Sequence, residues 1–256
     1  MFTSTVLAED VRYYDVEIIV IENLAENAKH AENWPLEVNL PKPEKLITLG
    51  EPFPAEWLPS EFDVAISYML LPADKFQLIS EAEKIEKSKT QRVLYHTAWR
   101  QPGLDKDLSL PVYFKRELAG NDLKNDTQTT NRTTTHPLGS EVPAEGLHSS
   151  VLEGVLRVTL ARYLHFEADL TYRAKIPEVA VNSENPFSVL DTEKKREALI
   201  KQGVIHLNEE RRRIRSNELH YLDHPVLGVL LRITPYIPPV VDAANLPGSA
   251  AKAIKP

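Results

Sequence analysis

Histidines and carboxylates are the first residues whose spacing could support chemistry. His220 and His224 are four residues apart, and His165 and Glu167 are two apart. Histidines at positions i and i+4 of a helix can share a zinc ion, and a carboxylate can complete the site. Pro225 directly follows His224 and would end such a helix, so we expect both histidines in a turn, bonded to the backbone. A metal site built from the four residues remains the alternative.

Three arginines form the second candidate site. If the segment 211–215 is a strand, Arg211, Arg213 and Arg215 share one face at a spacing of roughly 6 to 7 Å. Such a row could bind a polymer that carries regularly spaced carboxylates, through bidentate contacts. In the alternative interpretation the row is solvated and pairs with carboxylates of a neighbouring strand. The candidate partners are Glu167, Asp169 and Glu209.

An aromatic side chain beside arginine and glutamine marks a third segment, 95–102. Trp99 is followed by Arg100 and Gln101, a combination found in sugar-binding sites, where the ring stacks on the apolar face of the sugar. The same residues are equally compatible with ordinary packing at the end of a strand.

The composition and the missing motifs exclude several functions. The chain has no cysteine, which rules out disulfides, thiolate nucleophiles and cysteine zinc sites. Its net charge of -7 argues against general binding to nucleic acids or to anionic membranes. The sequence contains no G-x-S-x-G, P-loop, GxGxxG or HExxH motif. We therefore assign no catalytic residue, no metal and no cofactor, and expect a protein that is not an enzyme.

Alternation of apolar and polar residues predicts the elements that position these side chains. The clearest pattern spans 152–173, where most even positions are apolar and most odd positions are polar. It predicts one long strand, bent near Arg162, which breaks the even series. Other strands are predicted at 13–21, which should lie near the middle of a sheet, and at 92–99, 111–118, 204–214 and 227–234. Helices are predicted at 74–87 and 191–202. The fold class is therefore α+β, with a mainly antiparallel β-sheet, two or so helices and long loops.

The remaining segments suggest a single domain over residues 9–234. The proline-rich segment 23–60 is expected to be an ordered loop fixed by Trp34, Phe53 and Trp57. The threonine-rich segment 120–150 is interpreted as a flexible excursion, and 235–256 as a loose tail rich in proline and alanine. Residues 1–8 end in Val-Leu-Ala, the pattern of a signal-peptidase site, so we expect them to be the end of a signal peptide removed near Ala8.

Several of these segments together resemble one protein family. The block 211–235, RRRIRSNELHYLDHPVLGVLLRITP, resembles the C-terminal signature of the CsiV family. The segments 13–20, 94–102 and 154–170 are similar to its other blocks and occur in the same order. The signature residues we single out are Glu218, His220, Tyr221, Asp223, His224 and Pro225.

The resemblance implies a periplasmic protein that binds peptidoglycan and supports cell-wall synthesis and cell shape. It also implies partnership with the outer-membrane lipoprotein LpoA, an activator of a class A penicillin-binding protein. Under this interpretation the binding surface is the outer face of the arginine row, Arg211, Arg213 and Arg215, with Trp99 and Arg100 nearby. Two alternatives remain: a metal-dependent wall hydrolase using His165, Glu167, His220 and His224, and an adaptor that reaches the wall only through a partner.

Overall fold

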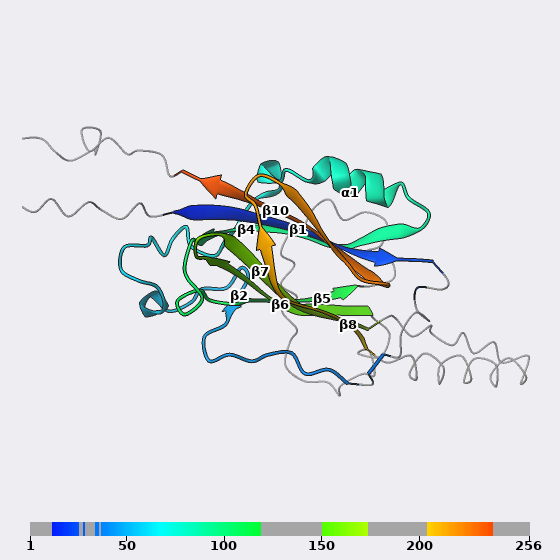
Figure 1. Ribbon diagram of the computed structural model, residues 1–256, viewed down its shortest axis with the longest axis horizontal. Coiled ribbons are helices and arrows are strands. Elements are labelled where there is room, and N and C mark those ends of the chain that lie inside the picture. The colour runs from blue at the N-terminus through cyan, green and yellow to red at the C-terminus, as the bar shows by residue number, and fades with distance from the viewer. Residues whose placement is uncertain are drawn as a thin grey trace, which may run out of the picture.

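Two five-stranded β-sheets form the body of the protein in a computed structural model, which describes residues 12–25, 28, 34–35, 37–118, 150–173 and 204–237. Sheet A has the strand order β3-β4-β1-β10-β9, and sheet B has the order β2-β5-β6-β7-β8 (Figure 1). The strands of sheet A are β1 (Tyr13–Asn23), β3 (Met69–Leu70), β4 (Gln91–Pro102), β9 (Leu219–Asp223) and β10 (Leu227–Tyr236). Those of sheet B are β2 (Ile47–Thr48), β5 (Val112–Leu118), β6 (Ser150–Leu160), β7 (Leu164–Arg173) and β8 (Ile205–Ile214).

The strand pairing confirms the α+β class with mainly antiparallel sheets. Every pair of described neighbouring strands is antiparallel except the two-residue pair of β2 and β5. The helical part of the described chain is α1 (Ile79–Glu86) with the 3-10 turns Ala55–Trp57 and Ala73–Lys75. No helix in this part is long and apolar enough to cross a membrane.

The central strand β1 is buried on both of its faces. Val16, Ile18 and Val20 point into the main core between the two sheets. On the other face, Ile19 and Ile21 pack against α1, which lies over sheet A (Figure 1). This double burial explains why the strand has a continuous apolar run rather than an alternating pattern, and it confirms the predicted place of β1 within its sheet.

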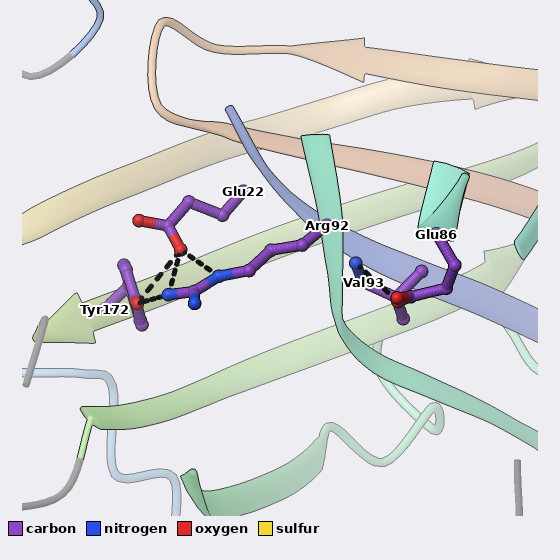
Figure 2. A network of polar contacts seen from close by, with 5 residues as sticks. All are labelled: Glu22, Glu86, Arg92, Val93 and Tyr172. Carbon is purple, nitrogen blue, oxygen red and sulfur yellow. Dashed lines mark hydrogen bonds and ion pairs between the residues drawn. The ribbon is translucent and has the colours of Figure 1, made fainter. Parts of the chain in front are cut away.

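Buried polar contacts tie the layers together. Figure 2 shows Glu22 of β1 accepting hydrogen bonds from the guanidinium of its cross-strand partner Arg92 and, across the sandwich, from the Tyr172 hydroxyl at 3.2 Å. Arg92 Nη2 also donates to the Tyr172 hydroxyl at 3.1 Å. In the same view, Glu86 at the end of α1 accepts a hydrogen bond from the backbone N–H of Val93 at 3.0 Å. These bonds link α1, sheet A and sheet B at one end of the sandwich.

The segment 152–173 is two strands, so the prediction of one long bent strand was wrong. Strands β6 and β7 form a hairpin in which Leu160 pairs with Leu164 and the chain reverses over the three residues between them. A reversal that pairs two even-numbered residues keeps all even positions on the same face of the sheet. The alternation therefore has the same parity on both sides of the turn, and its break at Arg162, interpreted as a bend, lies within the turn.

The helix predicted at 74–87 begins later than expected. A 3-10 turn at Ala73–Lys75 precedes α1, and the expected cap Asp74 makes no capping hydrogen bond there. Instead, the buried carboxylate of Glu17 on β1 accepts hydrogen bonds from the backbone N–H groups of Gln77 and Leu78, at 2.7 and 3.0 Å. A side chain from a distant strand thus fixes the start of the helix.

The loop residues behave as the sequence indicates. Trp34, Phe53 and Trp57 are partly buried and pack against the main core, which confirms that they fix the proline-rich segment. The strand β9 inside the 215–226 connection was not predicted. The predicted helix at 191–202, the tail beyond residue 237, residues 1–8 and nearly all of the threonine-rich segment lie outside the described residues.

Candidate functional site

A groove of about 710 Å³ lies on the outer face of sheet B. Its floor consists of β6, β7 and β8, whose outward side chains alternate with those that fill the core. The proline-rich segment and the connection before β5 form its sides. The lining residues are Pro41, Lys42, Pro43, Lys106, Pro111, Val155, Leu156, Arg157, Glu167, Ala168, Asp169, Asn208, Glu209, Glu210 and Arg211.

The carboxylates of the groove differ in how well they are paired. Asp169 Oδ1 lies 2.7 Å from Nε2 of His206, on the next strand. Glu209 forms a looser ion pair with Arg212 at 3.6 Å. Among the described residues, the ion pair of Glu167 is with Lys106, whose Nζ lies 3.8 Å from Oε1, beyond hydrogen-bonding distance.

Glu167 Oε1 is therefore an acceptor in need of a donor. The atom is shielded from solvent and accepts no hydrogen bond within the described part of the chain. Its cross-strand partner on β6 is Arg157, but no ion pair joins the two among the described residues. A shielded acceptor without a partner is uncommon in folded proteins and calls for an explanation.

The cations of the groove are the complementary feature. Arg157, Arg211 and Lys42 line it, and in the residues that the structure describes none of the three forms an ion pair with a carboxylate. An arginine left without a carboxylate partner retains its planar set of donors for a bidentate contact with a ligand. The groove can thus accept carboxylates and, at Glu167, a positively charged donor.

The predicted arginine row exists only in part. Arg211 lines the groove, and Arg213 lies opposite His165 with its guanidinium over the ring of Tyr163, at 3.4 Å from the ring centroid. Arg215 lies beyond the end of β8 and pairs with Glu218 at 3.6 Å, so one face shared by all three arginines was a wrong prediction.

The row is interrupted at Arg215 because β8 ends at Ile214, whereas a β-bulge near the start of the row sets the position of Arg211. The register between β7 and β8 shifts between Phe166 and Ala168, which face Arg212 and Glu209 respectively. Glu210 and Arg211 together therefore oppose the single residue Glu167. An extra residue of this kind interrupts the alternation of faces and re-aims a side chain, and here it places Arg211 beside Glu167.

The electrostatics of the row are visible at His165. Burial lowers the pKa of this imidazole, and the positive charges of Arg211 and Arg213 lower it further. Both arginines therefore act on the same part of the outer face of sheet B.

Trp99 and Arg100 lie elsewhere, in sheet A. Trp99 is fully buried in the main core, and its Nε1 donates to Gln101 Oε1 at 2.9 Å. Its ring is therefore enclosed by protein and has no face to offer a sugar, which supports the packing interpretation. Arg100 points to the opposite face of sheet A, where Asp15 holds it through two hydrogen bonds of 2.6 and 3.0 Å and the Tyr236 ring lies 3.1 Å from its guanidinium carbon.

The signature histidines bond the backbone as predicted, but the prediction that both lie in a turn was wrong for His220. His220 lies on β9, and its Nε2 is 3.2 Å from both the backbone nitrogen and the backbone oxygen of Arg215. His224 follows β9, and its Nδ1 accepts hydrogen bonds from the N–H groups of Val226 and Leu227 at 3.3 and 3.0 Å. These contacts shape the two turns that join β8, β9 and β10.

The other signature residues also serve this corner. The carbonyl of Pro225 accepts a hydrogen bond from Asn23 Nδ2 at 3.1 Å, which ties the second turn to β1. Tyr221 lies over Gly228 of β10, where any Cβ would collide with its ring. Burial raises the pKa of the Tyr221 phenol, and the neighbouring carboxylate of Asp223 raises it further. The signature block therefore builds a corner of the fold.

The four residues of the metal-site alternative are dispersed. His165 and Glu167 lie on the outer face of sheet B, whereas His220 and His224 lie at the β9 edge of sheet A. Across the described ranges, no three His, Cys, Asp or Glu side chains gather as metal ligands.

Sequence analysis did not identify Arg157, Lys106 and Lys42 as site residues. The alternation in 152–173 places Arg157 on the wet face, but only the pairing of β6 with β7 brings it beside Glu167. Lys42 and Lys106 come from loops, for which periodicity gives no position.

Comparisons with known proteins give one match. No curated protein and no solved structure is significantly similar to the chain. The model of a family described as peptidoglycan-binding protein, CsiV, matches residues 1–236, which include every strand and the groove described above. The chain therefore belongs to the CsiV family of peptidoglycan-binding proteins.

Proposed function

We propose that this protein is a periplasmic, non-catalytic accessory factor that binds peptidoglycan through the groove on sheet B and supports cell-wall synthesis. The observation that carries the proposal is the pair Arg157 and Arg211, two groove arginines without a carboxylate partner among the described residues. Family membership provides the polymer to which such a pair would bind.

The chemistry of peptidoglycan suits this groove. The polymer carries lactyl and stem-peptide carboxylates, which arginine binds through paired N–H donors. The net charge of -7 does not oppose binding, because salt screens charges farther away than about 8 Å under physiological conditions. Local arginines then dominate the interaction with the wall.

The partner and the location follow from the family resemblance. We propose export to the periplasm, with a signal peptide cleaved near Ala8, and partnership with the lipoprotein LpoA and through it with a class A penicillin-binding protein. Because α1 and sheet A lie on the side of the molecule away from sheet B (Figure 1), this side could contact such a partner while the groove holds the wall.

Co-sedimentation with protein-free sacculi tests the function directly. The purified protein should pellet with sacculi, and the bound fraction should fall as salt is raised. The double variant Arg157→Ala/Arg211→Ala should bind at least about ten-fold more weakly, because each charge-assisted hydrogen bond contributes roughly 1.5–3 kcal/mol. Lys87→Ala, which removes an exposed cation at the end of α1, is the matched control and should bind normally.

Two results would count against the proposal. If the double variant is folded and pellets as well as the original protein, the groove is not the wall-binding site. If the original protein pellets only after LpoA is added, it is an adaptor without wall affinity of its own.

A further inference from the structure

The three charged side chains on the groove floor form a line across sheet B. Arg157 on β6 lies directly opposite Glu167 on β7 in the strand register. Glu167 lies opposite the bulge of β8 that contains Arg211. Neighbouring strands lie about 4.8 Å apart, so the two arginines flank the glutamate at a separation of about 10 Å between backbones. A carboxylate thus lies between two cations without pairing to either within the described residues.

This arrangement fits a ligand that carries both charges. Glu167 Oε1 is shielded and accepts no hydrogen bond from the described residues, so it requires a donor. Lys106, at 3.8 Å and with its side chain 56% exposed, is free to swing away when a ligand approaches. An ammonium group on Glu167 would leave the attached carboxylate within reach of an arginine on either side.

The lining also distinguishes peptide from sugar. Among the described residues that line the groove, none is aromatic, so a stacking surface for a pyranose ring is missing there. Its apolar surface comes from Pro41, Pro43, Pro111 and Val155. These side chains suit the aliphatic stem of an amino acid, and the volume of about 710 Å³ lies within the range of small-ligand sites.

We propose that the groove recognises a zwitterionic carbon of the peptidoglycan stem peptide, with its ammonium on Glu167 and its carboxylate on Arg157 and Arg211. The inference rests on the peptidoglycan-binding function proposed above and adds the substructure that is bound. The distal carbon of a diamino acid such as diaminopimelate carries both charges wherever its amine has not been acylated by a cross-link. The protein therefore binds stem peptides with a free distal amine and not the glycan strands.

Calorimetric titration with three synthetic tripeptides tests the proposal on the full chain. The first peptide has meso-diaminopimelate as its third residue, the second has lysine there and so lacks the distal carboxylate, and the third has the distal amine acetylated. The first should bind, and each of the others should bind at least about ten-fold more weakly, because each loses one charge-assisted contact.

Protein variants assign each charge to its side chain. Glu167→Gln keeps the shape but loses the charge, and it should weaken binding of the diaminopimelate peptide about ten-fold while leaving the already weak acetylated peptide unchanged. Arg157→Ala should likewise weaken binding of the diaminopimelate peptide about ten-fold, and it should leave the already weak binding of the lysine peptide unchanged. Glu83→Gln, an exposed carboxylate on α1, is the matched control and should change nothing.

The outcomes separate this inference from the general function. Equal affinity for the three peptides, or unchanged binding of the diaminopimelate peptide by Glu167→Gln, would overturn the inference. If sacculi bind in a groove-dependent manner but peptide-free glycan strands compete and the tripeptide does not, the inference fails and the proposed function stands. If sacculi do not bind at all, the proposed function fails independently of the peptide titrations.

Discussion

Removing Arg92 should destabilise the protein by about 3 kcal/mol, because it takes the cation away from a buried carboxylate. Glu22 is 0% exposed, and the Arg92 Nε and Nη2 atoms both donate to its Oε2 (Figure 2). Breaking a buried pair from one side costs roughly 3–5 kcal/mol. We expect the lower end of that range, since the Arg92 side chain is 26% exposed and water can enter the vacated space.

Thermal unfolding followed by circular dichroism measures this cost. For a domain of this size each kcal/mol lowers the melting temperature by about 2–4 °C, so Arg92→Ala should melt roughly 6–12 °C below the original protein. Adding Glu22→Gln to Arg92→Ala should restore at least about 1 kcal/mol, because a neutral amide is much cheaper to bury than a carboxylate. This rescue distinguishes a charge effect from lost packing.

The exposed ion pair on α1 provides the reference. Lys87 and Glu83 lie 3.8 Å apart and both are mostly exposed, so Lys87→Ala should cost no more than about 0.5 kcal/mol. If Arg92→Ala lowers the free energy of unfolding as little as Lys87→Ala does, or if adding Glu22→Gln restores none of it, the buried ion pair does not stabilise the contact between the two sheets.

Three further predictions address the groove face and the core. Burial and then the charge of Arg211 lower the pKa of His165 below its ordinary 6.5, so stability should fall as the pH drops below that value, and Arg211→Ala should raise the His165 pKa in an NMR titration. Gly154→Ala would push a Cβ into the side chain of its cross-strand neighbour Leu170 and should cost about 1–3 kcal/mol in urea unfolding, whereas a neutral result would mean that Leu170 moves aside without strain. Burial raises the pKa of Tyr68 to about 12, so the stability of the protein should be retained below pH 10 and decline between pH 10 and about 12. Unfolding assays that find no decline in this range would refute this effect of burial.

The strands could be predicted because the order of apolar and polar side chains along each strand follows which of its faces are buried. The apolar run of β1 indicated a strand that is buried on both faces. The alternating run of β10 indicated a strand with one face in the core. The turn between β6 and β7 was predicted only as a bend near Arg162, because a three-residue reversal leaves the same parity on both of its sides. Partition into two sheets was equally hidden, because alternation shows which face is buried and not which strand lies beside it.

Site residues could be predicted only where the local sequence identifies them. Arg211 and its candidate neighbour Glu167 were both named from the sequence, but Arg157 was not, because its place beside them depends on strand register and on a bulge that no local pattern reveals. The prediction that Trp99 and Arg100 share one binding surface did not allow for the geometry of a strand. Consecutive residues of a strand point to opposite faces, so one enters the core and the other faces outward.

The family signature and the groove use different parts of the chain. His220, His224 and Tyr221 shape the corner that joins β8, β9 and β10, through bonds to the backbone and a close contact with Gly228. Of the whole block 211–235, only Arg211 lines the groove. The signature residues thus build a corner of the fold, whereas the chemistry proposed for the groove lies on β6, β7, the bulge of β8 and two loops. Variants of the signature histidines should consequently act through stability, and only groove variants can alter ligand preference in a folded protein.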